Sequence, residues 1–579
     1  MAGNISSPDH DHHYQTCRID ATTHITDAMK DDTDKAASAS SEATATTATK
    51  KRKKKHIFKK KIPQKGDPDY LTPTQLRNRR KRNAKKKEKQ QQQQQQQQEP
   101  STKSNSGGSN NNKKDELKDP SMKYISYPTK TPIIRTAKKY IEPLLQSSNN
   151  NSFRVYIGPL YYWRTVSKLA VRPDTYNSQK VAIGLFSENS HSLLPVPKCK
   201  AHHPSINRVV EMVTDACHEL NIIPYESNTK DNENKSEEEM GQLRYIGVNI
   251  ERSTGAAQLT LVWNGKREEK DDCLEKLVGL ILKKSTICVS GEEPARKKQR
   301  RRGRRGGSGG SKESLGTDDD EKASRNNAVS LHSLWINYNF SWKHSNRIFE
   351  YDASCWRHIE GPSSITEHLH FPSAKTEGQK GVADPTPPTY AVPLHFPPTV
   401  FRQANLDSFT NIVGRIRERV LMMDDKPFCI ELYGGVGTIA LNLSDAVSHL
   451  VSSDENPNNL KCFQESVEQL PVEIQPVLEY KQKNAADMVN TESALFQKCE
   501  LLIVDPPRKG LEDEVVDYLC KGDCSSIKLI IYVSCGFDAF KRDCDALLAS
   551  GRWRLDFAEG HVLFPGSDAV ETLAFFVPK

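Results

Sequence analysis

Two side chains with the chemistry of an active site follow two short apolar runs near the end of this chain. Asp505 comes directly after residues 501–504 (LLIV), and Cys535 ends the run 529–535 (LIIYVSC). Short, fully apolar runs separated by a helical segment predict neighbouring buried strands of a parallel sheet. Because open α/β sheets bind ligands at the carboxyl ends of their strands, we expect the carboxylate and the thiol in one crevice. A thiolate at that position has the chemistry of a nucleophile.

Two further candidates accompany this pair. Glu571 precedes the last apolar run, 572–577 (TLAFFV), and a carboxylate beside a thiol and a bound cofactor is a candidate general base. The DPPR motif at 505–508 holds its aspartate on a rigid lip, because two prolines fix the backbone and remove two N–H donors. Arg508 in this motif is a candidate for contact with a phosphate or a base.

A glycine-rich turn is expected after a third apolar run. Residues 431–444 (ELYGGVGTIALNLS) predict a strand, a turn and a helix, and the spacing G-G-x-G is not that of a dinucleotide site. Asp454 ends the next predicted strand, where a carboxylate commonly binds ribose hydroxyls. Together these features favour an adenosine-bearing cofactor, and S-adenosylmethionine fits the shorter loop because it has no pyrophosphate. A structural turn with a surface aspartate is the alternative.

These motifs need a scaffold of alternating strands and helices. Residues 395–579 predict a Rossmann-like, doubly wound α/β sheet with helices on both faces. A central α+β domain is predicted for residues 121–394, with a disordered basic insert at 291–327. Residues 1–120 are expected to form a disordered tail that carries lysine and arginine clusters and a polyglutamine run.

Charge and composition narrow the partners and the compartment. The net charge is +9, and the basic clusters predict either nuclear localisation or RNA attraction, with a solvated charged tail as the alternative. The 13 cysteines are scattered and no signal peptide is evident, which favours an intracellular location, in the nucleus or cytoplasm, with an organelle as the alternative. No apolar run is long enough to span a bilayer, so we expect no membrane partner.

Taken together, these stretches resemble the RNA uracil-5 methyltransferase family, class I S-adenosylmethionine-dependent enzymes that make 5-methyluridine in tRNA and rRNA. The similarity is greatest to a eukaryotic branch found in plants and algae. It rests on five stretches in family order: FRQAN (401–405), ELYGGVG (431–437), DPPRKGL (505–511), YVSCGFDAF (532–540) and FPGSDAVETLAFF (564–576). The resemblance covers the last domain and extends more weakly to the central one, which it identifies as an RNA-recognition domain.

The resemblance implies roles for individual residues. Cys535 would add to C6 of the target uracil, C5 would take the methyl group of S-adenosylmethionine, and Glu571 would remove the C5 proton. The target base must leave any stack to reach the pocket. The cofactor contacts would fall on Gln403, Tyr433, Thr438, Asp454, Asn484 and Asp505.

The chain departs from the family pattern at several positions. The family's usual Asn, Thr, His and Asp are replaced by Gly536, Ala539, Ala569 and Val562. Many bacterial relatives hold an iron–sulfur cluster with four cysteines. Cys199 resembles the last of the four, but only Cys17 precedes it, so we expect no cluster.

These departures leave two other functions open. The first is a catalytically silent RNA-binding or chaperone protein that keeps the methyltransferase fold. The second is a cytosine-5 RNA methyltransferase. Those enzymes place their nucleophilic cysteine after a proline in the DPP-type motif, where this chain has Pro507, and this counts against the second function.

Overall fold

The computed structural model describes residues 119–145, 152–175, 177–186, 193–196, 198–226, 241–288, 328–340, 348–371 and 387–579. The predicted basic tail, apart from its last two residues, and the whole of the predicted insert 291–327 lie outside these ranges. Within them, no helix has the length and apolar character that a membrane crossing requires.

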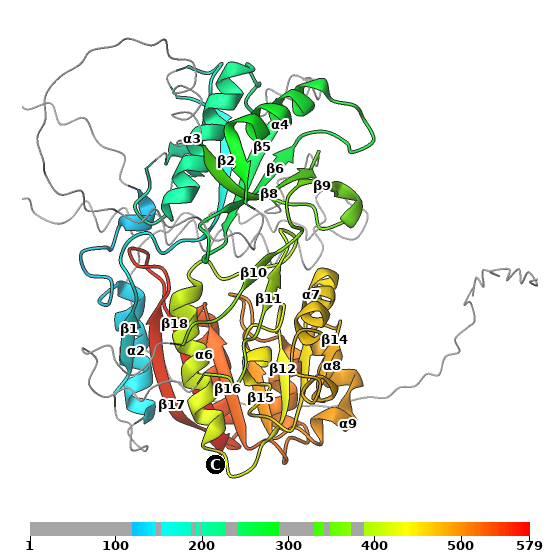
Figure 1. The fold of residues 1–579 in the computed structure, drawn as a ribbon. Coiled ribbons are helices and arrows are strands. Elements are labelled where there is room, and N and C mark those ends of the chain that lie inside the picture. Colours follow the sequence, from blue (N-terminus) through cyan, green and yellow to red (C-terminus); the bar gives the residue numbers. More distant parts are fainter. Residues whose placement is uncertain are drawn as a thin grey trace, which may run out of the picture. The chain divides into compact units, whose positions relative to one another are not determined.

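An eight-stranded sheet in the order β1-β17-β18-β16-β15-β12-β13-β14 carries the predicted motifs (Figure 1). The five strands from β16 to β14 run parallel, and β18 lies antiparallel between β16 and β17. The strands are β1 (Arg154–Ile157), β12 (Phe428–Leu432), β13 (His449–Ser453), β14 (Leu478–Lys481), β15 (Leu501–Val504), β16 (Leu529–Ser534), β17 (Trp553–Val562) and β18 (Glu571–Pro578). The predicted fold class is thereby confirmed.

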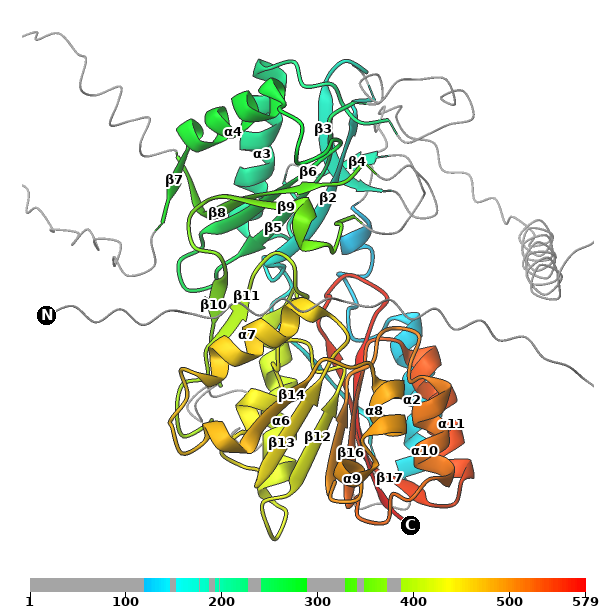
Figure 2. The same cartoon turned by 90° about the vertical axis from the view of Figure 1, so that its right-hand side faces the viewer.

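Helices cover both faces of this sheet (Figure 2). Because successive strand residues point to opposite faces, Ile530 and Tyr532 of β16 pack with one group of helices, and Ile531 and Val533 pack with the other. The first group is α2 (Pro132–Leu145), α8 (Ala485–Thr491), α10 (Asp513–Lys521) and α11 (Phe537–Ala549). The second group is α6 (Leu406–Leu421) and α7 (Pro457–Val467). Short helices complete this part of the chain: η5 (Ala440–Leu443), η6 (Gln475–Val477) and α9 (Ser493–Phe496).

The order of the strands creates a binding position at the centre of the sheet. From β12 the chain continues to β13 and β14 on one side, and then returns to β15 and β16 on the other side. Ligands of open α/β sheets bind outside the carboxyl ends of the strands where the order reverses in this way. The glycine-rich turn follows β12 and Asp505 follows β15, so both predicted motifs lie at the reversal.

A second sheet, in the order β4-β3-β2-β5-β6-β8-β7 with β9 paired to β8, forms a central unit. Helices α3 and α4 pack on it; in α4, Leu274, Leu277, Val278 and Ile281 recur at helical spacing and are buried. The elements are η1 (Pro120–Met122), β2 (Val166–Pro173), β3 (Val181–Phe186), β4 (Leu193–Pro195), α3 (Pro204–Glu219), β5 (Leu243–Ile250), β6 (Ala257–Trp263), α4 (Asp272–Lys284), β7 (Ser285–Ile287), β8 (Val329–Tyr338), η4 (Ala353–Cys355) and β9 (Trp356–Glu360). A two-stranded sheet, β10 (Ile365–Glu367) with β11 (Leu394–Phe396), comes between the central and last parts of the chain.

The predicted division into a central and a last domain differs from the structure for one segment. Residues 132–157 were assigned to the central domain, but α2 and β1 join the sheet of the last domain. Strand β1 pairs in parallel with β17, where Tyr156 lies opposite His561. The physical reason is that β17 would otherwise be a long exposed edge of the sheet, which a further strand covers.

A buried ion network fixes the segment that leads into α6. Arg402 forms an ion pair with Glu367 and donates a hydrogen bond from Nη1 to the carbonyl oxygen of Ile250 at 2.8 Å. Arg252 donates from Nε to Oε2 of the same glutamate at 2.8 Å and also pairs with Asp407 of α6. Arg402 and Glu367 are both almost fully buried. The residue after Arg402 is the predicted cofactor contact Gln403, so this network sets the position of its backbone.

Candidate functional site

Strand register brings the predicted nucleophile and the predicted base together. Ser534 of β16 lies opposite Thr572 of β18 in an antiparallel pair. Strand β16 ends at Ser534; its register continued by one residue would set Cys535 opposite Glu571, and the Glu571 charge acts on the Cys535 thiol. Residues that face each other in an antiparallel pair have Cα atoms about 4.5–5.5 Å apart and side chains on the same face of the sheet. Glu571 is also paired with His561 on its other side.

The thiol of Cys535 lies in an acidic setting and is partly accessible. Burial, together with the charges of Glu571 and Asp505, raises its pKa to about 11. The guanidinium of Arg508 opposes this rise. The two predicted catalytic residues, the predicted substrate residue Arg508 and the predicted cofactor contact Asp505 are therefore close enough to influence one another electrostatically. A cation bound beside the thiol would favour the thiolate.

Glu571 is buried at the start of β18. Burial and the charge of Asp505, opposed by Arg508, raise the pKa of its carboxyl group to about 8. A carboxylate with its pKa in this range is a far stronger base than an exposed one, and it can accept a proton near neutral pH.

Asp505 is partly buried at the end of β15, and burial raises the pKa of its carboxyl group to about 7. Within the part of the chain that the structure describes, no protein group donates a hydrogen bond to this carboxylate. A desolvated carboxylate without a partner is unfavourable until a cation or a donor joins it. This is the setting that the amino group and sulfonium of S-adenosylmethionine would complete.

The turn after β12 exposes its backbone to the crevice. Tyr433, Gly435 and Gly437 have φ values of 62°, 57° and 83°, a region that favours glycine. A Cβ atom on Gly435 would meet nothing within 4 Å, so the backbone here faces open space. The Gly435 N–H donates to Oδ2 of Asp454 at 3.1 Å, which places the predicted ribose-binding carboxylate beside the turn. The helix expected after this turn is the short η5.

Sequence reasoning assigned no role to Glu431, although it lies in the quoted ELYGGVG stretch. Its Oε2 accepts from the Ser452 hydroxyl at 2.5 Å, and its Oε1 accepts from the Ala440 N–H at 3.2 Å. Burial raises the pKa of its carboxyl group to about 8, and the hydrogen bond from Ser452 opposes this. Glu431 thus ties the end of β12 to the neighbouring strand β13 and to the first residue of η5, which follows the glycine-rich turn. The signal in the sequence is a carboxylate inside an otherwise apolar strand.

Two of the other predicted cofactor contacts already have partners in the protein. Asn484 caps α8, where its Oδ1 accepts from the Asp487 N–H at 2.7 Å. The hydroxyl of Tyr433 donates to Glu512. Thr438 lies partly exposed in the turn. Their roles toward a cofactor stay predictions.

The replacement at Gly536 has a steric reason. A Cβ atom at this position would lie 2.6 Å from the carbonyl oxygen of Arg508 and 3.1 Å from its Cα atom, so the DPPR loop comes too close for a larger side chain. The loop is held there by Asp543 of α11, whose Oδ2 accepts from the Leu511 N–H at 2.9 Å and from the Tyr532 hydroxyl at 2.8 Å. The asparagine usual in the family would force the loop away from the thiol.

The described residues contain no cluster of three or more histidine, cysteine, aspartate or glutamate side chains that could hold a metal ion. The thiol of Cys199, predicted to resemble an iron–sulfur ligand, donates to Oδ2 of Asp119 at 2.8 Å. Burial, followed by that hydrogen bond, raises the pKa of the thiol to about 11. The expected absence of an iron–sulfur cluster stays a prediction.

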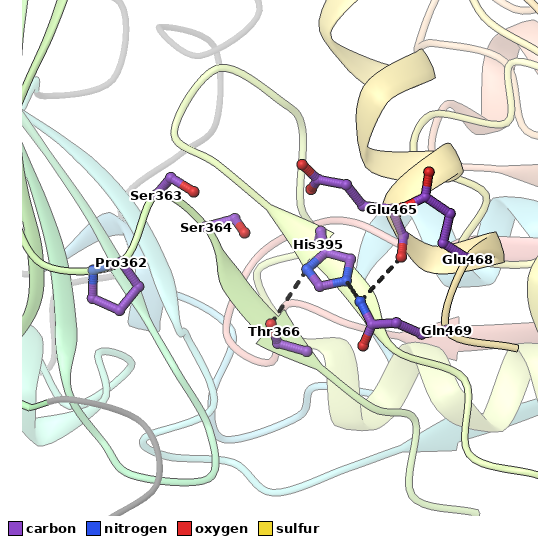
Figure 3. A pocket seen from close by; sticks show the side chains of 8 residues that line it. All are labelled: Pro362, Ser363, Ser364, Thr366, His395, Glu465, Glu468 and Gln469. Carbon is purple, nitrogen blue, oxygen red and sulfur yellow. Dashed lines mark hydrogen bonds between the residues drawn. The ribbon is translucent and has the colours of Figure 1, made fainter.

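A pocket of about 310 Å³ lies between the β10–β11 hairpin and the end of α7 (Figure 3). Its central side chain is His395, whose Nδ1 is 3.3 Å from the Thr366 hydroxyl and whose Nε2 accepts from Gln469 Nε2 at 2.8 Å. Burial lowers the pKa of His395. None of the predicted catalytic or cofactor residues lines this pocket, and its polar contacts join the hairpin to α7.

Comparisons with known proteins point in one direction, although no family model matches. The chain is 28% identical over 444 residues to an uncharacterized RNA methyltransferase of Protochlamydia amoebophila, covering 76% of this chain and 93% of that protein. It is 24% identical over 242 residues to a 23S rRNA (uracil(1939)-C(5))-methyltransferase of Francisella tularensis, covering 40% of this chain and 49% of that protein.

Among solved structures, the chain is similar to the tRNA (uracil-54, C5)-methyltransferase of Pyrococcus abyssi in complex with S-adenosyl-L-homocysteine. The TM-score is 0.48 at 19% identity, with 77% of this chain and 83% of that chain covered. The predicted plant and alga branch stays a prediction. The sequence relatives confirm the predicted resemblance: this chain is similar to RNA methyltransferases, and uracil-C5 enzymes are among them.

Proposed function

We propose that this protein transfers a methyl group from S-adenosylmethionine to C5 of a uridine in tRNA or rRNA. The single observation that carries the proposal is the register of β16 and β18: Ser534 lies opposite Thr572, and the same register continued by one residue would set Cys535 opposite Glu571, beside the carboxyl ends of the parallel strands. The named uracil-C5 relatives support the same reaction. A catalytically silent RNA-binding protein would have no need of this pair.

The residues at the reversal of strand order, after β12, β13 and β15, fit the proposed cofactor. The open backbone at Gly435 leaves room for a ligand, Asp454 offers a carboxylate to ribose hydroxyls, and Asp505 offers an unpaired carboxylate to a cation. S-adenosylmethionine, when bound, supplies an electrophilic methyl group. Gln403, Tyr433, Thr438 and Asn484 are the further contacts that the resemblance implies.

In the proposed reaction, the thiolate of Cys535 adds to C6 of a uracil that has left its stack. The bond saturates the 5,6 double bond and moves negative charge onto C5 and O4, which makes C5 nucleophilic. C5 then forms a bond to the methyl carbon as the bond from sulfur to that carbon breaks. Glu571 accepts the proton from C5, the 5,6 double bond forms again, and the C6–S bond breaks to release the thiolate. Arg508 would hold the phosphate or base beside the pair.

The test is product formation by the full chain. The protein is incubated with S-adenosylmethionine labelled in its methyl group and with total tRNA or rRNA, and digested nucleosides are separated. We expect label in 5-methyluridine, and loss of product by at least about 10³-fold in Cys535→Ala. Cys520→Ala, at another partly exposed cysteine, is the matched control and should keep full activity.

The affinity of the Cys535→Ala variant for S-adenosylmethionine, measured by calorimetry, should equal that of the native protein. An inactive native chain that binds the cofactor and RNA would favour the silent alternative. A Cys535→Ala variant that still makes 5-methyluridine would remove Cys535 from the reaction.

A further inference from the structure

The connection between β1 and β2 carries three exposed apolar side chains in a row. Leu160, Tyr161 and Tyr162 are 37%, 43% and 54% exposed. The next residue, Trp163, is buried, and Arg164 lies with its guanidinium carbon 4.9 Å from the Trp163 ring centroid. Two neighbouring tyrosines exposed to this extent contribute little to a core, and a cluster of exposed apolar side chains marks a candidate binding surface.

This segment lies beside the candidate active site. The backbone N–H and the hydroxyl of Thr165 donate to the carbonyl oxygen of Ala404 at 2.8 and 3.1 Å, next to Gln403. On the same segment, the ring of Trp163 packs edge-on against Phe564, with 5.5 Å between ring centroids. Phe564 belongs to the loop between β17 and β18, which ends at Glu571. The segment therefore joins the two stretches that lead to the cofactor and to the base.

The backbone holds the two rings outward at some cost. Tyr162 has φ 62°, a conformation unfavourable for residues with a side chain. Its N–H donates to the carbonyl oxygen of Lys200 at 2.8 Å, which fixes that conformation. The Tyr161 and Tyr162 ring centroids lie 6.4 Å apart. An exposed loop residue has no structural need for this strain.

The segment around Lys200, whose carbonyl oxygen accepts from the Tyr162 N–H, supplies positive charge. Lys198 and Lys200 are both exposed, and neither forms an ion pair with any residue in the described ranges. The surface thus combines two exposed aromatic rings with two exposed lysines. Stacking faces beside phosphate-binding cations are how proteins hold single-stranded nucleic acid.

We infer that Tyr161, Tyr162, Lys198 and Lys200 form a stacking surface for unpaired RNA nucleotides that flank the target uridine. The inference rests on the proposed function for its position, since a uridine drawn into the crevice leaves its neighbours unstacked. The tyrosine rings stack on these bases, and the lysines contact the adjoining phosphates. The surface reads no sequence, because every base has an aromatic face.

The test measures affinity for a fluorescein-labelled RNA hairpin with an unpaired uridine-rich loop, by anisotropy at several salt concentrations. The double variant Tyr161→Ala/Tyr162→Ala should weaken binding by about 30-fold, as loss of two stacked bases predicts. The slope of log Kd against log salt should stay unchanged, because no phosphate contact is removed. Tyr161→Phe/Tyr162→Phe should restore affinity to within about threefold.

Matched variants separate stacking from charge. Lys198→Ala/Lys200→Ala should reduce the salt slope by about 1 to 2 while leaving a stacking contribution. Tyr351→Ala removes a tyrosine that is 57% exposed elsewhere in the central unit and should change nothing. A fully paired RNA duplex should bind the native and tyrosine variants alike. Sedimentation of each variant tests whether the rings join two copies of the chain instead.

Unchanged hairpin affinity in the alanine variant, or a change in oligomeric state in place of affinity, would overturn the inference. The result is separable from the proposed reaction. A chain that makes 5-methyluridine but binds RNA normally without the two tyrosines keeps its function and loses this surface. If the native chain makes no 5-methyluridine but its alanine variant loses hairpin binding, the stacking surface is supported and the proposed reaction is not.

Discussion

The two halves of the candidate crevice differ in how their polar groups are satisfied. After β12 and β13, and before α8, the polar groups have protein partners: Asp454 accepts from two backbone N–H groups, Asn484 caps a helix, and Tyr433 donates to Glu512. After β15 and before β18, the carboxylates of Asp505 and Glu571 have no hydrogen-bond donor among the described residues. Burial raises the pKa of both.

The difference indicates which groups await a ligand. A polar group that the protein already satisfies gains little from a bound molecule, whereas a desolvated group without a partner gains a full interaction. We therefore expect substitutions on the β15–β18 side to alter binding and chemistry most. Substitutions on the β12–β14 side should alter stability as much as binding.

The largest effect on cofactor affinity is expected at Asp505. Asp505→Asn keeps the shape and removes the charge, so affinity for S-adenosylmethionine should fall by about 10²-fold or more, because a buried cation loses its counter-charge. Isothermal titration calorimetry measures the change. Asp454→Asn is the matched control on the other side of the crevice and should reduce cofactor affinity by about tenfold or less. A ribose hydroxyl can still donate a hydrogen bond to the amide oxygen, whereas a cation loses its counter-charge. Equal losses would abolish the distinction between the two halves.

Gly536→Asn is expected to disturb the loop that holds Arg508. The added side chain needs space now filled by the Arg508 backbone at 2.6 Å from the Cβ position. A displacement of about 1 Å near the reacting atoms lowers turnover by about 10²-fold. Single-turnover methylation with saturating cofactor measures this, and Gly279→Asn, at an exposed position of α4 with nothing within 4 Å, is the control. Full activity of Gly536→Asn would show that the loop moves freely.

The pH dependence should reflect the acidic setting. Both reacting groups must lose a proton, and both pKa values are raised, to about 8 for Glu571 and about 11 for Cys535. The rate therefore increases as pH rises, by up to about 100-fold per unit below pH 8, where both groups still titrate, and by about tenfold per unit above pH 8, where only the thiol does. Initial rates across this range test the prediction. A profile that is level from about pH 6 upward would mean that bound cofactor and RNA lower both pKa values.

The smallest effect is expected at Asn484. Asn484→Ala removes the cap of α8 and should destabilise the protein by about 1 kcal/mol. Cofactor affinity should fall by less than about threefold if capping is the main role of this side chain. Denaturant unfolding and calorimetry measure the two quantities on one sample. A large loss of affinity with unchanged stability would move Asn484 to the ligand-binding side of the comparison.

The sequence predicted well what local composition controls. The run 501–504 is strand β15 with the same limits, and Glu571 is the first residue of β18. Fully apolar runs that end at a charged residue define buried strands and their ends with little ambiguity. The expectation that Cys535 and Glu571 share a crevice needed one more fact, the register of β18. A slip of one residue would have turned the carboxylate to the opposite face.

Contacts between distant segments were beyond sequence reasoning. The pairing of β1 with β17 joins residues 154–157 to residues 559–562, and no local pattern specifies that partner. The close approach of Arg508 to Gly536, and the ion network that holds Arg402, also depend on loops that meet in space alone. For the same reason the replacement at Gly536 read as a loss in the sequence, whereas the structure gives it a steric cause.

The central claim is that Cys535 and Glu571 act on one uracil, and covalent capture tests it most directly. In the Glu571→Gln variant, the Cys535 thiolate should still add to C6 of the base. The glutamine amide cannot accept the C5 proton, so the methylated adduct accumulates. We predict a protein–RNA species in denaturing gels with Glu571→Gln, RNA and S-adenosylmethionine, and its absence when Cys535→Ala is combined with Glu571→Gln. An adduct that persists without Cys535, or a Glu571→Gln variant that turns over normally with no adduct, would contradict the account.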